Sequence, residues 1–226
     1  MRLVLTNDDG IDAAGLAALR SAAAGVGDLT VVAPAHEWSG ASHQVTTGRA
    51  FRVETRGRDH VVHGSPADCV RVALEHLVPD ADWVLSGINH GGNLGADVWH
   101  SGTVAAVREA ALHGRPGIAL SHYQRRGLAV DWARAAAWIA ELLPELIAGG
   151  LAPGRFLAVN LPHIDPGVPR PEAVRCGLDP SPLPLRFRHE GDTVAYAGDY
   201  HQRARRPGMD VEVCFGGRIS VVELSL

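Results

Sequence analysis

The 226-residue chain contains no lysine, and this absence excludes one common way of binding a nucleotide. A phosphate loop of the Walker type needs a lysine that reaches the phosphates, so the chain has no such loop. All the basic charge other than histidine is arginine, and the formal net charge is −4. This charge balance gives no electrostatic footprint for a nucleic-acid polymer or an anionic membrane.

Cysteines and long apolar runs are also scarce. Cys69, Cys176 and Cys214 are far apart, odd in number and without a Cys-x-x-Cys spacing. This pattern disfavours a disulfide framework and is typical of free thiols in a reducing cytosol. No stretch reaches the roughly 20 apolar residues that span a bilayer, and the N-terminal run lacks the apolar core of a signal peptide. We therefore expect a soluble, cytoplasmic protein that binds no membrane.

Apolar runs bounded by turn residues alternate with helix-forming stretches along the chain. Residues 3–6 and 29–34 have the composition of buried strands, and residues 14–24 between them have that of a helix. This β-α-β order predicts a parallel sheet that is covered by helices. With 46% hydrophobic residues the chain can bury a sizeable core. The sequence therefore predicts an α/β fold with a three-layer, doubly wound and mostly parallel sheet.

The same alternation continues to about residue 163 and then changes. Further helices are expected at residues 66–77, 103–113 and 130–148, the last interrupted by Pro144, and further strands at residues 83–86, 117–121 and 156–160. After a proline-rich stretch, residues 186–200 are expected to hold a hairpin and residues 218–226 a strand of alternating exposure. We expect residues 1–163 to form the catalytic core. Residues 164–226 then form a β-rich C-terminal extension of the same structural domain, used for subunit contact.

Four polar, glycine-rich loops follow the predicted strands or precede the predicted helices. They cover residues 7–10, 37–40, 87–95 and 100–103. In a doubly wound sheet, ligands bind at the carboxyl ends of the parallel strands, where such loops converge. Each loop taken alone is a weak signal, but their occurrence at successive strand ends indicates a common site.

Two adjacent carboxylates, Asp8 and Asp9, stand at the end of the first predicted strand. Their mutual repulsion raises the pKa of one of them unless a cation lies between them. Hard oxygen ligands of this kind suit Mg²⁺, Mn²⁺ or Ca²⁺ better than a thiolate-seeking ion. The alternative is that one of them forms an Asx turn or caps the following helix. The pair of residues alone leaves both interpretations open.

Two further loops could hold a phosphate. Residues 101–103, Ser-Gly-Thr, directly precede a predicted helix, whose N-terminal N–H groups and dipole favour an anion. The loop at residues 87–95 places Asn89 and Asn93 among four glycines, which suggests close backbone approach to a ligand. The alternatives are an ordinary helix cap and a flexible surface turn. The loop is not Gly-x-Gly-x-x-Gly, so a dinucleotide-binding fold is poorly supported.

Several motifs in a fixed order carry a resemblance to a known family. They are Thr-Asn-Asp-Asp-Gly-Ile at 6–11, Val-Val-Ala-Pro at 31–34, Ser-Gly-Ala-Ser at 39–42, Gly-Ser-Pro-Ala-Asp-Cys-Val at 64–70, Ser-Gly-Ile-Asn at 86–89 with Asn-Leu-Gly at 93–95, and Ser-Gly-Thr-Val at 101–104. In order and spacing the chain resembles the SurE family of survival-protein 5′/3′-nucleotidases over residues 1 to about 125. Residues 160–162, Asn-Leu-Pro, resemble the family's Asn-x-Pro strand end. The C-terminal part departs from the family, since Gly-Arg-Ile-Ser stands at 217–220 in place of Gly-Tyr-Val-Ser.

The resemblance implies a Rossmann-like core and a phosphomonoesterase that hydrolyses nucleoside 5′-monophosphates, with 3′-monophosphates as further candidates. It implies one divalent cation per subunit, Mg²⁺ or Mn²⁺, with Ca²⁺ as a substitute, held by Asp8, Asp9, Ser39 and Asn89. It also implies a homodimer or homotetramer, assembled partly through exchanged C-terminal β-elements. The expected substrate is a small-molecule nucleotide or phosphate ester and not a nucleic-acid polymer.

The working hypothesis is metal-assisted transfer of a phosphoryl group to water. The expected catalytic residues are Asp8, Asp9 and Asn93, and the expected phosphate-binding residues are Gly40, Asn93, Ser101, Gly102 and Thr103. Asp8 or Asp9 would orient or deprotonate the water, and a nucleophilic role for Asp8 is a less favoured variant. Two alternatives stay open: a broad-specificity phosphatase or exopolyphosphatase for other substrates, and a nucleotide-binding module without catalysis.

Overall fold

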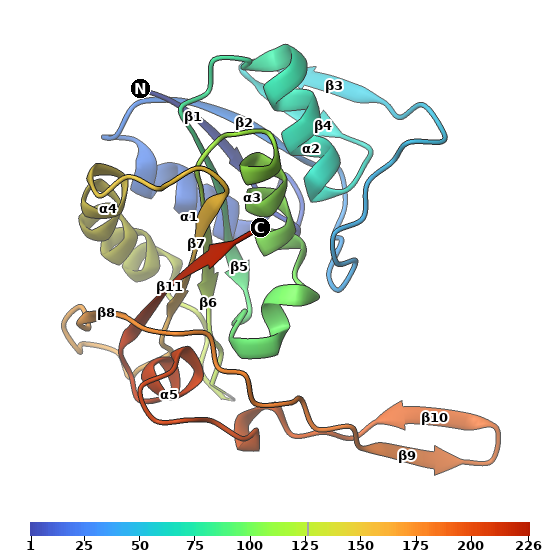
Figure 1. Ribbon diagram of the computed structural model, residues 1–226, viewed down its shortest axis with the longest axis vertical. Helices are drawn as coiled ribbons and strands as arrows, with labels where there is room; N and C mark the ends of the chain where they lie inside the picture. The colour runs from blue at the N-terminus through green and yellow to red at the C-terminus, as the bar shows by residue number, and fades with distance from the viewer. Residues whose placement is uncertain (126) are drawn as a thin grey trace.

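The computed structural model describes residues 1–125 and 127–226, which are built around one nine-stranded sheet (Figure 1). In spatial order the strands are β3 (Val53–Arg56), β4 (Asp59–Val62), β2 (Asp28–Pro34), β1 (Arg2–Thr6), β5 (Trp83–His90), β6 (Gly117–His122), β7 (Arg155–Leu161), β11 (Ile219–Ser225) and β8 (Ala173–Arg175). The strands from β4 to β7 in this order run parallel, whereas β3 and β11 are antiparallel to their neighbours β4 and β7. The predicted mostly parallel α/β fold is therefore confirmed.

The central strands are apolar on both faces because helices cover both faces of the sheet. In β1, Leu3 and Leu5 pack into one hydrophobic cluster and Val4 packs into another, and all three side chains are fully buried. Successive side chains of a strand point to opposite faces, so a continuous apolar run is what a strand between two helical layers requires. This explains why a run of four residues was enough to predict β1.

Four helices form the outer layers (Figure 1). The helices α1 (Ala14–Ala23) and α4 (Trp132–Ala148) pack together on one face, and α2 (Pro66–Val72) and α3 (Gly102–Leu112) pack together on the other. The interruption predicted at Pro144 is wrong, because α4 runs through this residue to Ala148. Burial of Leu142, Leu143 and Leu146 against the sheet outweighs the missing N–H donor of the proline.

The second predicted helix begins where expected and changes type before its end. Ser65 caps α2 by accepting the N–H of Asp68, and the Asp68 carboxylate accepts the N–H of Ser65 in return. Such a capping box satisfies two donors of the first turn. The α-helix ends at Val72 and continues as a π-helical turn at Ala73–Leu77, so the prediction for residues 66–77 is confirmed in extent but not in uniform geometry.

The C-terminal part of the chain completes the main sheet. The strand β11 lies between β7 and β8. Its first four residues are all buried, so the predicted alternating exposure is wrong for the first half of the strand and is confirmed for residues 222–225. A short helix that the sequence did not predict, α5 (Asp210–Phe215), precedes it. The predicted hairpin is confirmed as β9 (Phe187–Glu190) and β10 (Thr193–Tyr196), which projects away from the sheet (Figure 1).

The cysteines and the helices can be described directly. Cys69, Cys176 and Cys214 are all free. Within the described residues, no helix has the length and apolar character needed to cross a membrane.

The direction of winding reverses between β1 and β5. From β1 the chain proceeds outward to β2 and β4 on one side, and from β5 it proceeds to β6 and β7 on the other. A crevice forms at such a switch point, outside the carboxyl ends of the strands. Asp8 and Asp9 follow β1, and Asn89 is the penultimate residue of β5. The fold therefore brings these predicted site residues to the crevice.

Candidate active site

Asp8 and Asp9 link the end of β1 to two other segments. The side chain of Asp8 is almost fully buried, and its Oδ1 accepts the hydroxyl of Thr103 at the start of α3. Its backbone oxygen accepts the N–H of Trp38 at 2.7 Å. The Oδ2 atom of Asp9 accepts the N–H of His90, at the end of β5, at 3.1 Å. The two carboxylates therefore join β1, β5, α3 and the loop after β2.

The surroundings of both carboxylates disfavour their charged forms. Burial raises the pKa of Asp8 to about 6; the hydroxyl of Thr103 lowers this pKa in part, and the negative charge of Asp9 raises it again. Burial also raises the pKa of Asp9, although the N–H of His90 lowers it. A positive charge between the two carboxylates would reverse this penalty.

A polar cavity of about 210 Å³ lies beside Asp8. Its lining consists of Asp8, Ser39, Gly40, Asn89, His90, Asn93, Asp97, His100 and Ser101. A second cavity of about 290 Å³ is lined by Asp9 and Trp132 among others, and Ser39 and His90 line both. Most of the residues predicted from the four loops thus meet around two adjoining cavities.

Larger cavities lie elsewhere in the molecule. Two of about 580 Å³ each are found, one between α2 and the end of α3 and the other beside α1. A large cavity is often the binding site, but neither of these two is lined by Asp8, Asp9 or Asn89. We therefore place the candidate site at the smaller, polar pair of cavities.

The first turn of α3 contacts the side chain of Asp8. Ser101 caps the helix by accepting the N–H of Val104 at 3.0 Å, and it also lines the cavity. Gly102 and Thr103 are buried and are not among the lining residues. Gly102 lies against the Asp8 side chain, and the Thr103 hydroxyl is engaged by Asp8. The structure therefore places these two residues against Asp8 and not on the wall of the cavity, and their binding of phosphate stays a prediction.

The glycine-rich loop is held by β6 and β7. The side-chain amide of Asn93 donates to Ser121 Oγ at 2.8 Å, and the backbone N–H of Asn93 donates to Asn160 Oδ1 at 2.8 Å. Asn160 returns a bond from its own amide to the backbone oxygen of Asn93 at 3.0 Å. Asn160 belongs to the Asn-Leu-Pro strand end noted in the sequence, and its function here is to fix Asn93 at the cavity.

The donor set fits a hard divalent cation. Asn89 uses its Nδ2 to donate to Gly91 O, which leaves its carbonyl oxygen for a cation. Ser39 donates its proton to Glu37 Oε1 at 2.6 Å and so keeps its lone pairs available. Across residues 1–125 and 127–226, no three His, Cys, Asp or Glu side chains gather to hold a metal. Two carboxylates, a hydroxyl and an amide carbonyl form an all-oxygen set, and such sets suit Mg²⁺, Mn²⁺ or Ca²⁺.

Several residues that line the cavities were not predicted as site residues. Asp97 and His100 line the smaller cavity, and Trp132 lines the larger one. The position of His100 directly before Ser101 was a usable signal. Asp97 is held by the buried guanidinium of Arg203 and by the hydroxyl of Tyr200, so the C-terminal part reaches the wall of the site.

Fold and site together define a doubly wound α/β protein with an acidic, oxygen-lined site at its switch point. The family described as Survival protein SurE matches residues 3–177, and the chain belongs to this family. The predicted resemblance is therefore confirmed.

Individual relatives resemble the chain over almost its whole length. A protein of Nostoc sp. (strain PCC 7120 / SAG 25.82 / UTEX 2576), provisionally named a 5′-nucleotidase, is 49% identical to this chain. The match covers 99% of this chain and 99% of that protein. The 5′-nucleotidase SurE of Moorella thermoacetica is 37% identical over 100% of this chain and 90% of its own. The crystal structure of the SurE protein from Aquifex aeolicus matches with a TM-score of 0.85 and 27% identity, over 100% of this chain and 93% of that one.

Proposed function

We propose that this chain is a divalent-metal-dependent phosphomonoesterase that hydrolyses nucleoside 5′-monophosphates to nucleoside and phosphate. The observation that carries the proposal is the adjacent pair of the buried Asp8 and the half-buried Asp9, which line two small polar cavities at the switch point of the sheet. The names of the relatives support the nucleotide as substrate. Nucleoside 3′-monophosphates are a further candidate.

Asp8, Asp9, Ser39 and Asn89 would hold one Mg²⁺ or Mn²⁺ ion per subunit. When bound, the cation supplies charge that neutralises phosphate oxygens and lowers the pKa of a water molecule. Two small adjoining cavities, one lined by Asp8 and neutral donors and the other by Asp9, suit one phosphate group and its cation better than a polymer.

The phosphate of the substrate would lie in the cavity of about 210 Å³. Gly40, Asn93 and Ser101 line this cavity and would contact the phosphate oxygens. Gly102 and Thr103 form the first turn of α3, whose N–H groups and dipole favour a negative charge. Asn93 is held by three hydrogen bonds from the neighbouring strands, so it would meet developing charge without reorganising.

The attacking water needs a group that accepts or directs its proton. Asp8, whose pKa is raised to about 6 by burial, and Asp9, whose pKa burial also raises, are both suited to this role. Thr103 and the backbone of His90 each fix one of these carboxylates. A covalent attack by Asp8 is the less favoured variant, because a carboxylate that holds a cation is a weaker nucleophile.

Residues 164–226 would contribute the subunit contact of a homodimer or homotetramer. The hairpin β9–β10 projects from the sheet (Figure 1). Phe187 and Tyr196 on this hairpin are each about half exposed. A two-stranded hairpin is marginally stable alone, and exposed apolar side chains on it favour a partner. Residues 1–163 would then be the catalytic core of each subunit. The three free cysteines favour a cytoplasmic location.

Phosphate release tests the proposed activity. Nucleoside 5′- and 3′-monophosphates, p-nitrophenyl phosphate and short polyphosphate are compared with Mg²⁺, Mn²⁺ or EDTA, with the variant Asp9→Asn as a control. Release from 5′-monophosphates that needs metal and is lost in the variant supports the proposal. Faster release from p-nitrophenyl phosphate or polyphosphate would identify a broad phosphatase instead. Binding of nucleotides by folded protein without any release would identify a binding module.

A further inference from the structure

The chain segment that follows Ser39 and Gly40 is fastened to Trp99 and His100, the two residues directly before Ser101, the cap of α3. Ser42 has a φ of 55°, in the left-handed region that a residue with a side chain seldom adopts. Its N–H donates to the backbone oxygen of His100 at 3.2 Å, and its hydroxyl donates to that of Trp99 at 2.9 Å. A conformation of this kind persists where surrounding contacts impose it. The loop is thus held in one position and does not merely cover the site.

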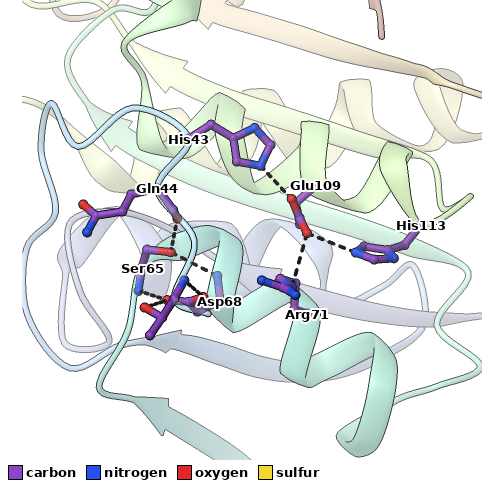
Figure 2. A network of polar contacts seen from close by, with 8 residues as sticks. His43, Gln44, Ser65, Asp68, Arg71, Glu109 and His113 are labelled. Carbon is purple, nitrogen blue, oxygen red and sulfur yellow. Dashed lines mark hydrogen bonds and ion pairs between the residues drawn. The ribbon is translucent and has the colours of Figure 1, made fainter. Parts of the chain in front are cut away.

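The next residue, His43, is fastened to a buried carboxylate. Glu109 on α3 is 5% exposed and accepts hydrogen bonds from Nε2 of His43 at 2.6 Å and of His113 at 3.0 Å (Figure 2). The Nε atom of Arg71 lies 3.6 Å away. Burial alone would raise the pKa of Glu109, but hydrogen bonds from the two imidazoles outweigh it and lower the pKa. Glu109 is therefore ionised and needs these donors.

The direction of the bond between His43 and Glu109 is fixed chemically. Nε–H of Arg108 donates to Nδ1 of His43 at 2.8 Å. Nδ1 is therefore an acceptor, and the proton of the neutral imidazole resides on Nε2, from which it is donated to Glu109. Two neighbouring residues of α3 thus hold both nitrogens of one loop side chain.

A second attachment follows immediately (Figure 2). The hydroxyl of Ser65 donates to the backbone oxygen of Gln44, and Thr46 donates its N–H and its hydroxyl to Asp68 at 2.8 and 2.7 Å. Ser65 and Asp68 are the capping box of α2. Residues 42–46 are therefore attached to α3 and α2 at consecutive points.

The helix α3 carries both the support of Asp8 and the support of the loop. Thr103 holds the Asp8 carboxylate, and Glu109 holds His43, four residues after Ser39. A rigid helix between these two contacts fixes the position of Ser39 and Gly40 relative to Asp8. We propose that Glu109 and His43 are positioning residues, which set the Ser39–Gly40 loop for metal and phosphate binding. The proposal rests on the proposed function of the Asp8 site.

The test compares His43→Leu, which deletes both ring nitrogens, with His43→Gln, whose amide keeps a donor for Glu109. Glu109→Gln removes the charge that three donors share, and Glu75→Gln makes the same change at an exposed position outside the network. Hydrogen–deuterium exchange of full-length, metal-free protein reports on residues 36–46. In this segment the N–H groups of Trp38, Ser42 and Thr46 are hydrogen-bonded. Activity at a series of Mn²⁺ concentrations provides the second readout.

We expect faster exchange of residues 36–46 in His43→Leu and Glu109→Gln, with unchanged exchange in the central strands. The Mn²⁺ concentration for half-maximal activity should rise by about 10-fold and kcat should fall by about 10- to 100-fold, as for residues that orient metal ligands. His43→Gln should recover most of both effects, and Glu75→Gln should show neither. Exchange of the loop at the wild-type rate in both damaging variants would overturn the proposal. An inactive wild-type protein would instead refute the proposed function, and the exchange data would still decide on the positioning role.

Discussion

The side chain of Asp8 lies directly against the backbone of Gly102. A methyl carbon placed on Gly102 would be 2.8 Å from Cβ and 2.9 Å from Oδ2 of Asp8. Carbon atoms do not approach so closely without displacement, and the backbone of Gly102 is fixed by its place in α3. The absence of a side chain at position 102 is therefore what allows Asp8 to occupy its position at the cavity.

Gly102→Ala should displace Asp8 and reduce kcat/KM by about 100-fold, since a shift near 1 Å at a reacting group has an effect of this size. Overpacking should lower the free energy of unfolding by about 1–3 kcal/mol. Steady-state kinetics and urea unfolding measure the two effects. Gly25→Ala is the matched control, because a methyl group there meets no atom within 4 Å. Wild-type kinetics in Gly102→Ala would show that Asp8 tolerates the displacement.

Asp8→Asn should abolish turnover and yet stabilise the metal-free protein at neutral pH. Burial raises the pKa of Asp8 from 3.8 to about 6, so the folded state binds this proton more tightly than the unfolded state. Its contribution to stability is therefore present below pH 4 and is lost as the pH rises through about 6. Asparagine is uncharged throughout, and its carbonyl can still accept the bond from Thr103.

The expected gain in unfolding free energy for Asp8→Asn is at most about 3 kcal/mol at pH 8 in EDTA, and close to zero at pH 3.5. Urea unfolding at both pH values measures it. Asp12→Asn serves as a control, since Asp12 is exposed and makes no buried contact. A loss of stability at pH 8 would mean that the ionised carboxylate is favoured by its surroundings, against the argument from burial.

The parts of the fold that depend on apolar runs were predictable, whereas its polar edge was not. The apolar composition of Leu3, Val4 and Leu5 is enough to predict a strand between two helical layers. The hairpin of β3 and β4 escaped prediction because its outer strand, Val53–Arg56, is mostly exposed and carries two charged residues. Such a strand forms because its neighbour β4 pairs with β2, which is information from elsewhere in the chain.

The site shows the same division. The positions of Asp8, Asn89 and Ser101 could be predicted because each stands at the end of a strand or the start of a helix. The contact of Asp97 with Arg203 joins residues that are 106 positions apart in the sequence, and no local sequence pattern predicts it. The contact of Gly102 with Asp8 depends on the distance between two backbones, which the identity of a glycine does not reveal. The contacts that could not be predicted, those of Asp97 and Gly102, thus depend on packing between segments that are distant in the sequence.

His122 should make the protein sensitive to acid. This last residue of β6 is 1% exposed, and burial lowers its pKa to about 4, although its Nδ1–H donates to the backbone oxygen of Tyr123 at 2.7 Å. The ring of His163 lies edge-on, 5.1 Å away. Because the folded state binds this proton more weakly than the unfolded state, stability is complete above pH 6.5 and falls as the pH decreases towards 4.

Across this pH range, His122 should lower the free energy of unfolding by at most about 3 kcal/mol. His122→Asn keeps a donor for Tyr123 and cannot be protonated, so the slope of unfolding free energy between pH 6.5 and 4 should decrease. Its absolute stability is lower because the smaller side chain leaves space. His76→Asn, at an exposed position, should leave the slope as it is in the wild type. An unchanged slope in His122→Asn would assign the acid sensitivity to other groups.

The buried ion pair between Arg203 and Asp97 should couple the C-terminal part to the site. The side chain of Arg203 is 2% exposed and that of Asp97 is 17% exposed, and Nη2 of Arg203 also donates to the backbone oxygen of Leu94 at 3.1 Å. Arg203→Met should lower the unfolding free energy by about 3–5 kcal/mol, because it leaves the Asp97 carboxylate without its charged partner, with only hydrogen bonds from Tyr200 and Leu94 remaining. Adding Asp97→Asn should restore part of the loss, and a double-mutant cycle in urea measures the coupling. Additive effects would show that the pair is not coupled.

The hairpin β9–β10 should hold subunits together through its aromatic pair. Phe187 and Tyr196 are paired across the two strands, with ring centroids 5.6 Å apart, and both are about half exposed. In a monomer such side chains face water, whereas in an oligomer they are buried by a partner. Phe187→Ser combined with Tyr196→Ser should therefore lower the mass measured by light scattering to that of a smaller assembly. Arg188→Ser, on the same strand, should leave the mass unchanged, because it removes no aromatic surface. If the double variant keeps the wild-type mass, the subunit contact lies elsewhere.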